Sequence, residues 1–327
     1  MKSLATTLFF TIFCFGLSGQ NKLQAPLDSL FEVLGRNKQI MGSLSLYEND
    51  EEIYFNSTGF ARLKSRQKPG PETTYRIGSI TKTFTAVVIM QLIEEDRLQI
   101  NDKLAQFFPK IPYAGQITIE SMLRHHSGLS DPDFLQWKYK GKSFKLRKKA
   151  VYANTNYVLL AEIAEQLEDK PFAQILHERV FEPCSLNHSH YGEKSDSLPP
   201  HEAFSYRWKN GWQRVSPSDL SQPHGAGSII ATPGDVNRFY AHLFSGKLLS
   251  EKSLNEMKTT VDGIGIGLMP MQFNTRKAFG HSGRIDGFES TIAYFPDSHF
   301  SICYISNGVA LPINDVLVAV LRTVWGD

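Results

Sequence analysis

The sequence predicts an α+β fold, an α/β sandwich in which both chain ends build one antiparallel sheet of about five strands flanked by terminal helices. A helix pattern and a hairpin pattern come first, and three strand patterns and a helix come last. The segments between them are mainly helical. We therefore expect one domain over 21–327, with an α/β lobe at about 21–76 plus 225–327 and an inserted helical lobe at about 77–224.

Residues 1–20 read as a cleavable signal peptide, because Lys2 precedes an apolar run from Leu8 to Leu17 and small or polar residues follow. The run is shorter than the roughly 18 apolar residues that span a bilayer, so no stable membrane insertion is expected. The Cys at position 14 lacks a lipoprotein-type small-residue box. We expect a secreted or periplasmic protein.

The mature N-terminus begins with an expected helix at 24–36, followed by two strands. The helical spacing is carried by Leu27, Leu30, Phe31 and Leu34. Strands are expected at Ile40–Tyr47 and Ile53–Asn56, because a polar turn separates two runs with strand pattern.

In the middle, a long apolar helix starts near Ser79, and its buried face has helical spacing. A loop-rich stretch, a short helix and two further helices then follow, at 102–112, 117–123, 155–168 and 171–181. Thr232 is an N-cap with an acid three residues later, so another helix starts there.

The last fifty residues favour strands and one helix. The strands are expected at 278–282, 288–295 and 300–306, and the helix at 312–325.

Composition excludes several classes of function. The 327 residues include 35 basic and 33 acidic ones, which leaves no charge footprint for nucleic acid. No Cys/His cluster has zinc spacing, and His125 and His126, adjacent on the chain, point in different directions, so they make a poor metal pair. Cys184 and Cys303 are expected as free buried thiols, although export would permit a disulfide.

Ser79-Ile80-Thr81-Lys82 is the strongest chemical motif. A helix that begins near Ser79 places Lys82 one turn along the same face, where its amine can meet the serine hydroxyl. A second match, Ser65 to Lys68, lies in a charged loop that ends in Pro69-Gly70-Pro71. We therefore predict Ser79 as the nucleophile, activated by Lys82.

Tyr152-Ala153-Asn154 stands before a helix and can point both polar side chains into one cleft. Tyr152 has a free pKa near 10, and a neighbouring ammonium would favour its phenolate, which makes it a candidate general base. The same tripeptide pattern occurs at 47–49 and 54–56, in or beside the hairpin.

His281-Ser282-Gly283 lies in a late strand, where Gly283 would leave the strand edge open to a substrate backbone. An earlier copy, His126 to Gly128, falls at a helix end, where His is more often structural.

These three motifs in this order, with Leu123–Leu129 and Gly225–Ser228, resemble the serine β-lactamase-related hydrolases. That family includes class C β-lactamases, D-alanyl-D-alanine carboxypeptidases, D-aminopeptidases and carboxylesterases. The resemblance covers about residues 26–325.

The resemblance implies an acyl-enzyme on Ser79, with Lys82 and Tyr152 moving its proton to the leaving group. Asn154 would hold Lys82 and a substrate carbonyl, His281 and Gly283 would bind substrate, and the backbone N–H groups of Ser79 and Arg284 would form the oxyanion hole. No cofactor is implied, and the partner is a small-molecule or peptide substrate of a protein that we expect to be a monomer.

Two departures bear on specificity. His281 stands where lactamases and carboxypeptidases place a lysine, and a neutral imidazole offers no permanent charge to a substrate carboxylate. The segment before Tyr152 lacks the usual Pro-Gly and is rich in lysine from Lys138 to Lys149, which is either a solvated surface or a surface that steers anions.

We therefore expect a serine hydrolase that acts on esters or amides of small acyl, D-amino-acid or peptide substrates. The alternatives are a class C-type β-lactamase or D,D-carboxypeptidase and, in another class, a penicillin-binding sensor or scaffold with little turnover. An α/β-hydrolase is disfavoured because the chain has no G-x-S-x-G.

Overall fold

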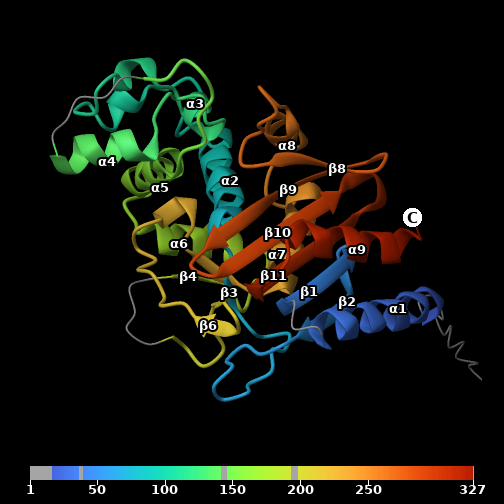
Figure 1. The fold of residues 1–327 in the computed structure, drawn as a ribbon. Coiled ribbons are helices and arrows are strands. Elements are labelled where there is room, and N and C mark those ends of the chain that lie inside the picture. Colours follow the sequence, from blue (N-terminus) through green and yellow to red (C-terminus); the bar gives the residue numbers. More distant parts are fainter. Residues whose placement is uncertain (1–16, 37–39, 141–145, 193–197, 327) are drawn as a thin grey trace, which may run out of the picture.

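The computed structural model describes residues 17–36, 40–140, 146–192 and 198–326. Within these ranges the main sheet has six antiparallel strands in the order β2-β1-β11-β10-β9-β8 (Figure 1). Their bounds are Glu51–Thr58 (β2), Ile40–Glu48 (β1), Phe300–Val309 (β11), Phe288–Phe295 (β10), Arg276–Ile285 (β9) and Met269–Phe273 (β8). The predicted α+β class is confirmed, and β8 is an additional strand that the sequence analysis missed. Its sequence contains Pro270, which an edge strand tolerates because one side of its backbone needs no partner.

Both ends of the chain do meet in this sheet. β1 pairs with β11 along its length, with Leu44 opposite Tyr304, and β2 pairs with the other edge of β1. The hairpin at the start of the domain is therefore held by the last strand.

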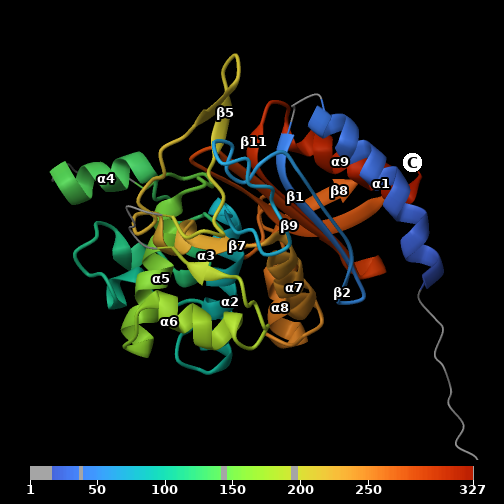
Figure 2. The same ribbon diagram turned by 90° about the horizontal axis from the view of Figure 1, so that it is seen from below.

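Two helices cover one face of the sheet (Figure 2). They are α1 (Leu17–Arg36) and α9 (Ile313–Trp325), and they bury Leu27, Phe31 and Val320 against the sheet. α1 begins within the expected signal peptide, whose first sixteen residues lie outside the described ranges.

The opposite face packs on α7 (Pro233–Phe244) and, beyond it, on the helical region. α7 begins as predicted, because Thr232 Oγ1 accepts a hydrogen bond from Asp235 N at 3.0 Å. Phe239 of α7 stacks on Phe84 of α2 (Thr81–Glu94) with ring centroids 3.6 Å apart, which joins the two layers in one core.

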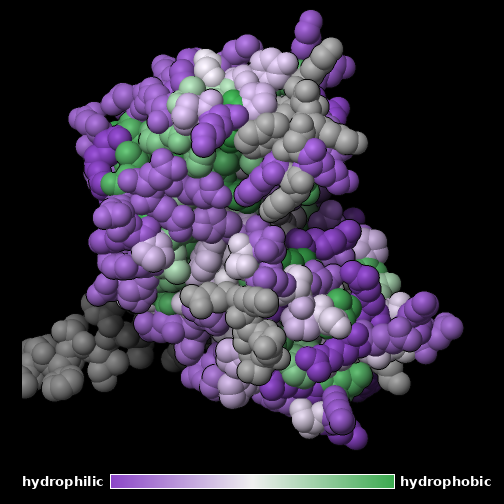
Figure 3. All heavy atoms as spheres, turned by 90° about the vertical axis from the view of Figure 1, so that its left-hand side faces the viewer, coloured by the Kyte–Doolittle hydropathy of each residue, from purple (hydrophilic) through white to green (hydrophobic). Residues whose placement is uncertain are grey.

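The remaining helices surround α2. They are α3 (Ile119–Leu123), α4 (Asp131–Lys140), α5 (Asn154–Glu168), α6 (Phe172–Leu176), which continues as a π-turn over His177–Phe181, and α8 (Glu251–Lys258). The sequence analysis missed α4 and α8. Figure 3, seen from the side of α4 and α6, shows hydrophilic residues over most of this face.

Short strands complete the fold. β3 (Tyr75–Arg76), β7 (Ile229–Ala231) and β4 (His190–Tyr191) form a small sheet, and β5 (Tyr206–Trp208) and β6 (Trp212–Arg214) form a hairpin. Cys184 and Cys303 are buried and not bridged. None of the helices in the described ranges has the length and apolar character that spanning a bilayer would require.

Candidate active site

The turn that carries Ser79 lies between the helical region and β9. A single 3₁₀ turn, Gly78–Ile80, leads directly into α2. Gly78 has φ +53°, and a Cβ at that position would lie 2.9 Å from the backbone nitrogen of Arg284. The glycine therefore lets the backbone of β9 approach the serine turn closely.

Lys82 is buried beside the serine. Its Nζ donates to Ser79 Oγ at 2.9 Å, to Asn154 Oδ1 at 2.8 Å and to the Ala226 carbonyl at 2.8 Å. Burial lowers the pKa of Lys82 to about 7, against an opposing effect of the Asp131 carboxylate. A large fraction of this amine is neutral at physiological pH, and a neutral amine has a lone pair for the serine proton.

Tyr152 lies on the other side of Lys82, whose Nζ is 5.0 Å from the centre of the phenol ring. The surface of Tyr152 is 44% exposed, and its hydroxyl is close enough to Ser79 for the serine to affect the pKa of the phenol. Burial raises the pKa of Tyr152 to about 12, the Ser79 hydrogen bond opposes this rise, and the Asp131 charge adds to it. The pKa of Tyr152 is therefore shifted in the direction opposite to the one that a lysine ammonium would produce, and burial is the largest cause.

Asp131 is a site residue that the sequence analysis missed. Its Oδ2 accepts from Asn154 Nδ2 at 3.0 Å, and its Oδ1 accepts from Thr155 N and Thr155 Oγ1, both at 2.9 Å. One carboxylate thus caps α5 and fixes the amide of Asn154, whose oxygen faces Lys82. The sequence offered one signal for this role: Asp131 comes two residues after Leu123–Leu129, a segment that is part of the family resemblance.

His125 also belongs to this site. Its ring stacks on Tyr152 with centroids 4.2 Å apart, and its Nδ1 accepts from the backbone N–H of Ala153 at 3.2 Å. Burial lowers the pKa of His125 to about 3, so the ring is neutral and its proton is on Nε2. The sequence analysis had considered it only as half of a poor metal pair.

His281 lies on β9 and is buried. Its Nδ1–H donates to the Ser282 carbonyl at 2.6 Å, which leaves Nε2 as an acceptor. Burial lowers the pKa of His281 to about 4, so the imidazole carries no charge near neutral pH.

The other two predicted residues of β9 have different surroundings. A Cβ at Gly283 would lie 2.0 Å from the Ile77 carbonyl, so this glycine is required for packing against the serine turn and does not simply leave the strand edge open. The guanidinium of Arg284 pairs with Glu289 at 2.7 Å, while its backbone faces Gly78.

Two of the competing motif matches lie away from this cluster. Ser65 lies in an exposed loop, where its hydroxyl donates to the Arg62 carbonyl, and Tyr54 bonds Asp28 of α1. Of the basic stretch, Lys142 and Lys145 lie outside the described residues, and Arg147 pairs with Asp133. In the described part of the chain, no three His, Cys, Asp or Glu side chains come together as a metal site would require.

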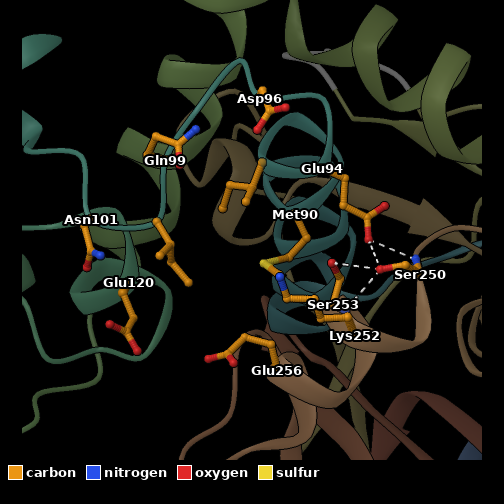
Figure 4. Close-up of a pocket in the computed structure, with 12 residues that line it drawn as sticks. Met90, Glu94, Asp96, Gln99, Asn101, Glu120, Ser250, Lys252, Ser253 and Glu256 are labelled. Atoms are coloured by element: carbon orange, nitrogen blue, oxygen red, sulfur yellow. Dashed lines mark hydrogen bonds between the residues drawn. The ribbon is translucent and has the colours of Figure 1, made fainter.

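A pocket of about 470 Å³ adjoins the cluster. Asp131 and Asn154 belong to its wall, and apolar side chains form much of the remainder, among them Phe134, Leu135, Val158, Pro223 and Ile285. A larger pocket of about 850 Å³ lies at the far end of α2, where Glu94, Asp96, Glu120 and Glu256 surround it (Figure 4). Three of these carboxylates already have partners. Glu94 accepts a hydrogen bond from Ser250, and Glu120 and Glu256 form ion pairs with Arg124.

Comparison with known proteins identifies the family of the chain. The family described as Beta-lactamase matches residues 27–319. The putative penicillin-binding protein PbpX of Bacillus subtilis is 30% identical over 270 residues, which cover 74% of this chain and 68% of that protein. The teichoic acid D-alanine hydrolase of Staphylococcus aureus is 29% identical over 234 residues, 68% of this chain and 59% of that protein.

Among solved structures, the D-amino acid amidase of Ochrobactrum anthropi superposes with a TM-score of 0.82 at 22% identity, over 93% of this chain and 99% of that one. An octameric penicillin-binding protein homologue from Pyrococcus abyssi gives 0.80 at 23% identity, over 93% and 78%. These likenesses establish the shared fold. With the family match over most of its length, the chain belongs to the β-lactamase family and is a serine hydrolase of the β-lactamase-related type.

Proposed function

We propose that this protein is an exported hydrolase that forms an acyl-enzyme on Ser79 and cleaves esters or amides of small acyl or D-amino-acid groups. The observation that carries the proposal is the Lys82 amine, which has a pKa of about 7 and lies 2.9 Å from Ser79 Oγ. Neutral Lys82 takes the serine proton while Oγ attacks the substrate carbonyl. Export rests on the signal-peptide pattern of residues 1–20.

The remaining groups assist this step. Backbone N–H groups of Ser79 and Arg284 stabilise the oxyanion, a contribution typically worth about 10²–10³ in rate for each donor. Tyr152 stays protonated because of its raised pKa, so it relays the proton from Lys82 to the leaving group and does not act as the first base. A water molecule then attacks the acyl-enzyme: Tyr152 and Lys82 take its proton and return one to Ser79 Oγ, which releases the acid.

The substrate class follows from the charges around the serine. His281 is neutral, and the Arg284 guanidinium is held by Glu289, so neither provides a free cation for a substrate carboxylate. Esters and amides without that carboxylate are therefore preferred over β-lactams and D-alanyl-D-alanine peptides. The names of the Staphylococcus hydrolase and the Ochrobactrum amidase agree with D-amino-acid esters or amides as substrates.

Three substrate types test this proposal: p-nitrophenyl esters, nitrocefin and D-amino-acid amides. We expect kcat/KM for esters or D-amino-acid amides to exceed the value for nitrocefin, and Ser79→Ala to abolish all turnover. Ser65→Ala is the matched control and should stay within a few-fold. A fluorophosphonate label mapped by mass spectrometry should lie on the peptide with Ser79. Labelling of Ser79 without turnover of any substrate would favour the sensor or scaffold.

A further inference from the structure

Two segments beside the catalytic cleft depart from the balanced charge of the chain. Residues 60–71 and 203–218 contain no Asp or Glu. Together they contain seven basic residues: Arg62, Lys64, Arg66, Lys68, Arg207, Lys209 and Arg214. We call these two segments the basic face. Since the whole chain has 35 basic and 33 acidic residues, this is a local concentration of positive charge.

The two segments are bound to each other. Phe204 N donates to the Ala61 carbonyl at 2.9 Å, and Leu63 N donates to Tyr206 Oη at 2.7 Å. The hairpin of β5 and β6 projects from the rest of the molecule (Figure 2). The basic face is therefore one surface, although more than a hundred residues separate its two segments.

Aromatic rings hold its cations in place. The guanidinium groups of Arg62 and Arg214 lie 4.5 and 3.7 Å from the centre of the Phe204 ring. Lys68 Nζ lies 4.4 Å from the Phe60 ring in the same way. The Arg62 guanidinium also donates to the backbone carbonyls of Glu202 and Pro199, so its role is to join the two segments. A cation–π contact through the face of Arg214 leaves the N–H groups at the edge of that cation for an anion.

Within the described ranges, none of the seven basic side chains forms an ion pair with a carboxylate. Of the acids close to these segments, Asp286 and Glu202 pair with Arg76, and Glu289 pairs with Arg284, while Glu72 and Asp219 directly follow the two segments in sequence. The positive charge of the basic face is therefore not neutralised by the protein itself.

Trp208 connects this face to the catalytic cleft. It lines a pocket of about 640 Å³ that also contains Phe60, Lys68 and Trp212. It also lines a second pocket, of about 510 Å³, whose wall includes Arg284, the residue next to the serine turn. Nearly half of the Trp208 surface is exposed, so a chain lying on this tryptophan would contact both pockets.

We infer that the basic face binds a polyanionic chain of phosphodiester-linked polyols or sugars, and that the hydrolysed group is carried on that chain. This inference rests on the proposed function. Phosphate groups would pair with the exposed lysine and arginine side chains. The C–H faces of a polyol or sugar would pack on the exposed tryptophan ring. A small acyl group makes few contacts of its own, so binding of the polymer to this remote surface would help to hold the acyl ester at Ser79.

The experiment measures binding separately from hydrolysis. Unesterified poly(glycerol phosphate) is immobilised, and binding of the wild-type protein is compared with that of the triple variant Lys64→Gln, Arg66→Gln, Lys68→Gln. The matched control, Lys103→Gln, Lys110→Gln, Lys277→Gln, removes the same charge from exposed positions elsewhere. We expect about 10-fold weaker binding for the first variant only, and a steeper loss with salt for wild type.

Catalysis provides the second measurement. On poly(glycerol phosphate) carrying D-alanyl esters, the basic-face variant should raise KM about 10-fold and leave kcat unchanged. Its rate on p-nitrophenyl acetate should equal that of wild type, which shows that the fold and the serine chemistry are intact.

Several outcomes would overturn the inference. One is equal polymer binding by wild type, variant and control. Another is tighter binding to phosphatidylglycerol vesicles or to single-stranded DNA than to the polymer, which would assign the face to a membrane or a nucleic acid. The binding measurement needs no turnover, so it tests the polymer inference alone. Failure of the proposed hydrolase function would appear separately, as the absence of p-nitrophenyl acetate hydrolysis by the wild-type protein.

Discussion

Lys82 and Tyr152 both lie against Ser79, but their proton affinities differ widely. The pKa of Lys82 is about 7 and that of Tyr152 about 12. Above pH 7 Lys82 is neutral and can accept the serine proton, and below pH 7 it is charged and cannot. We therefore expect log kcat to rise with pH, with a midpoint near 7, when single-turnover rates are measured between pH 5 and 9.

Tyr152→Phe separates the role of Tyr152 as a proton relay from the role of Lys82 as the base. It should lower kcat much more than it raises KM, while the midpoint near pH 7 remains, because that midpoint belongs to Lys82. A midpoint that disappears in this variant would make Tyr152 the titrating base.

The charge of Asp131 affects the protonation of the Lys82 amine, and its carboxylate also fixes the Asn154 amide that contacts Lys82. Asp131→Asn removes a negative charge that raises the pKa of Lys82, so the midpoint of the kcat profile should move to lower pH. Stability should also fall by about 0.5–2 kcal/mol, because a charged cap of α5 is weakened. Thermal unfolding would detect the second effect, and an unmoved pH midpoint would limit Asp131 to a structural role.

The neutral ring of His281 sets the preference between esters and β-lactams. His281→Lys introduces an ammonium beside the substrate carboxylate, a contact typically worth about 1.5–3 kcal/mol or roughly 10–150-fold. We expect kcat/KM for nitrocefin to rise relative to that for short-chain esters. Efficient nitrocefin hydrolysis by wild type, removed by Arg284→Ala, would contradict this argument and assign the carboxylate site to Arg284.

At the scale of elements, the site depends on the contact between the serine turn and β9. Gly283→Ala would place a methyl group against the Ile77 carbonyl, which cannot move without moving Ser79. We expect a loss of about 1–3 kcal/mol in unfolding free energy and a larger loss of kcat than of KM. Gly115→Ala is the control, because no atom lies within 4 Å of its Cβ position, and it should change stability by less than about 0.5 kcal/mol.

The elements that the sequence predicted share one property: their pattern is set within the segment. The Thr232 cap and the spacing of Leu27 and Phe31 are local signals, and α7 and α1 exist as expected. By contrast, β3, β4 and β7 are two or three residues long and form only because the chain brings them together. α4 was missed because its charged residues resemble a solvated surface.

The same reasoning applies to the site. Ser79 and Lys82 are one helical turn apart, so their contact follows from local geometry. Asp131 and His125 reach Asn154 and Tyr152 only through tertiary packing, which no local spacing reports. The direction of the Tyr152 pKa shift could not be predicted either, because it depends on how deeply the phenol is buried.

At the scale of the molecule, α1 and α9 support the sheet on the side away from Ser79. Phe31 of α1 is buried and meets Tyr304 of β11 edge to face, with ring centroids 6.3 Å apart. Phe31→Ala should cost about 3–5 kcal/mol of unfolding free energy in denaturant titrations, while kcat at low temperature stays near wild type. Val33→Ala, at a position that is 52% exposed, should change stability by less than about 0.5 kcal/mol, and equal effects of the two would argue against this packing.

The pairing of β1 with β11 also has a consequence for how the protein is made. A ribosome that adds about 5–20 residues per second needs roughly 15–50 s to proceed from Ile40 to Phe300. Throughout that time the apolar side chains of α1 and β1 have no β11 to cover them. The nascent chain therefore needs a chaperone, or transport across a membrane before it folds, to avoid aggregation during synthesis.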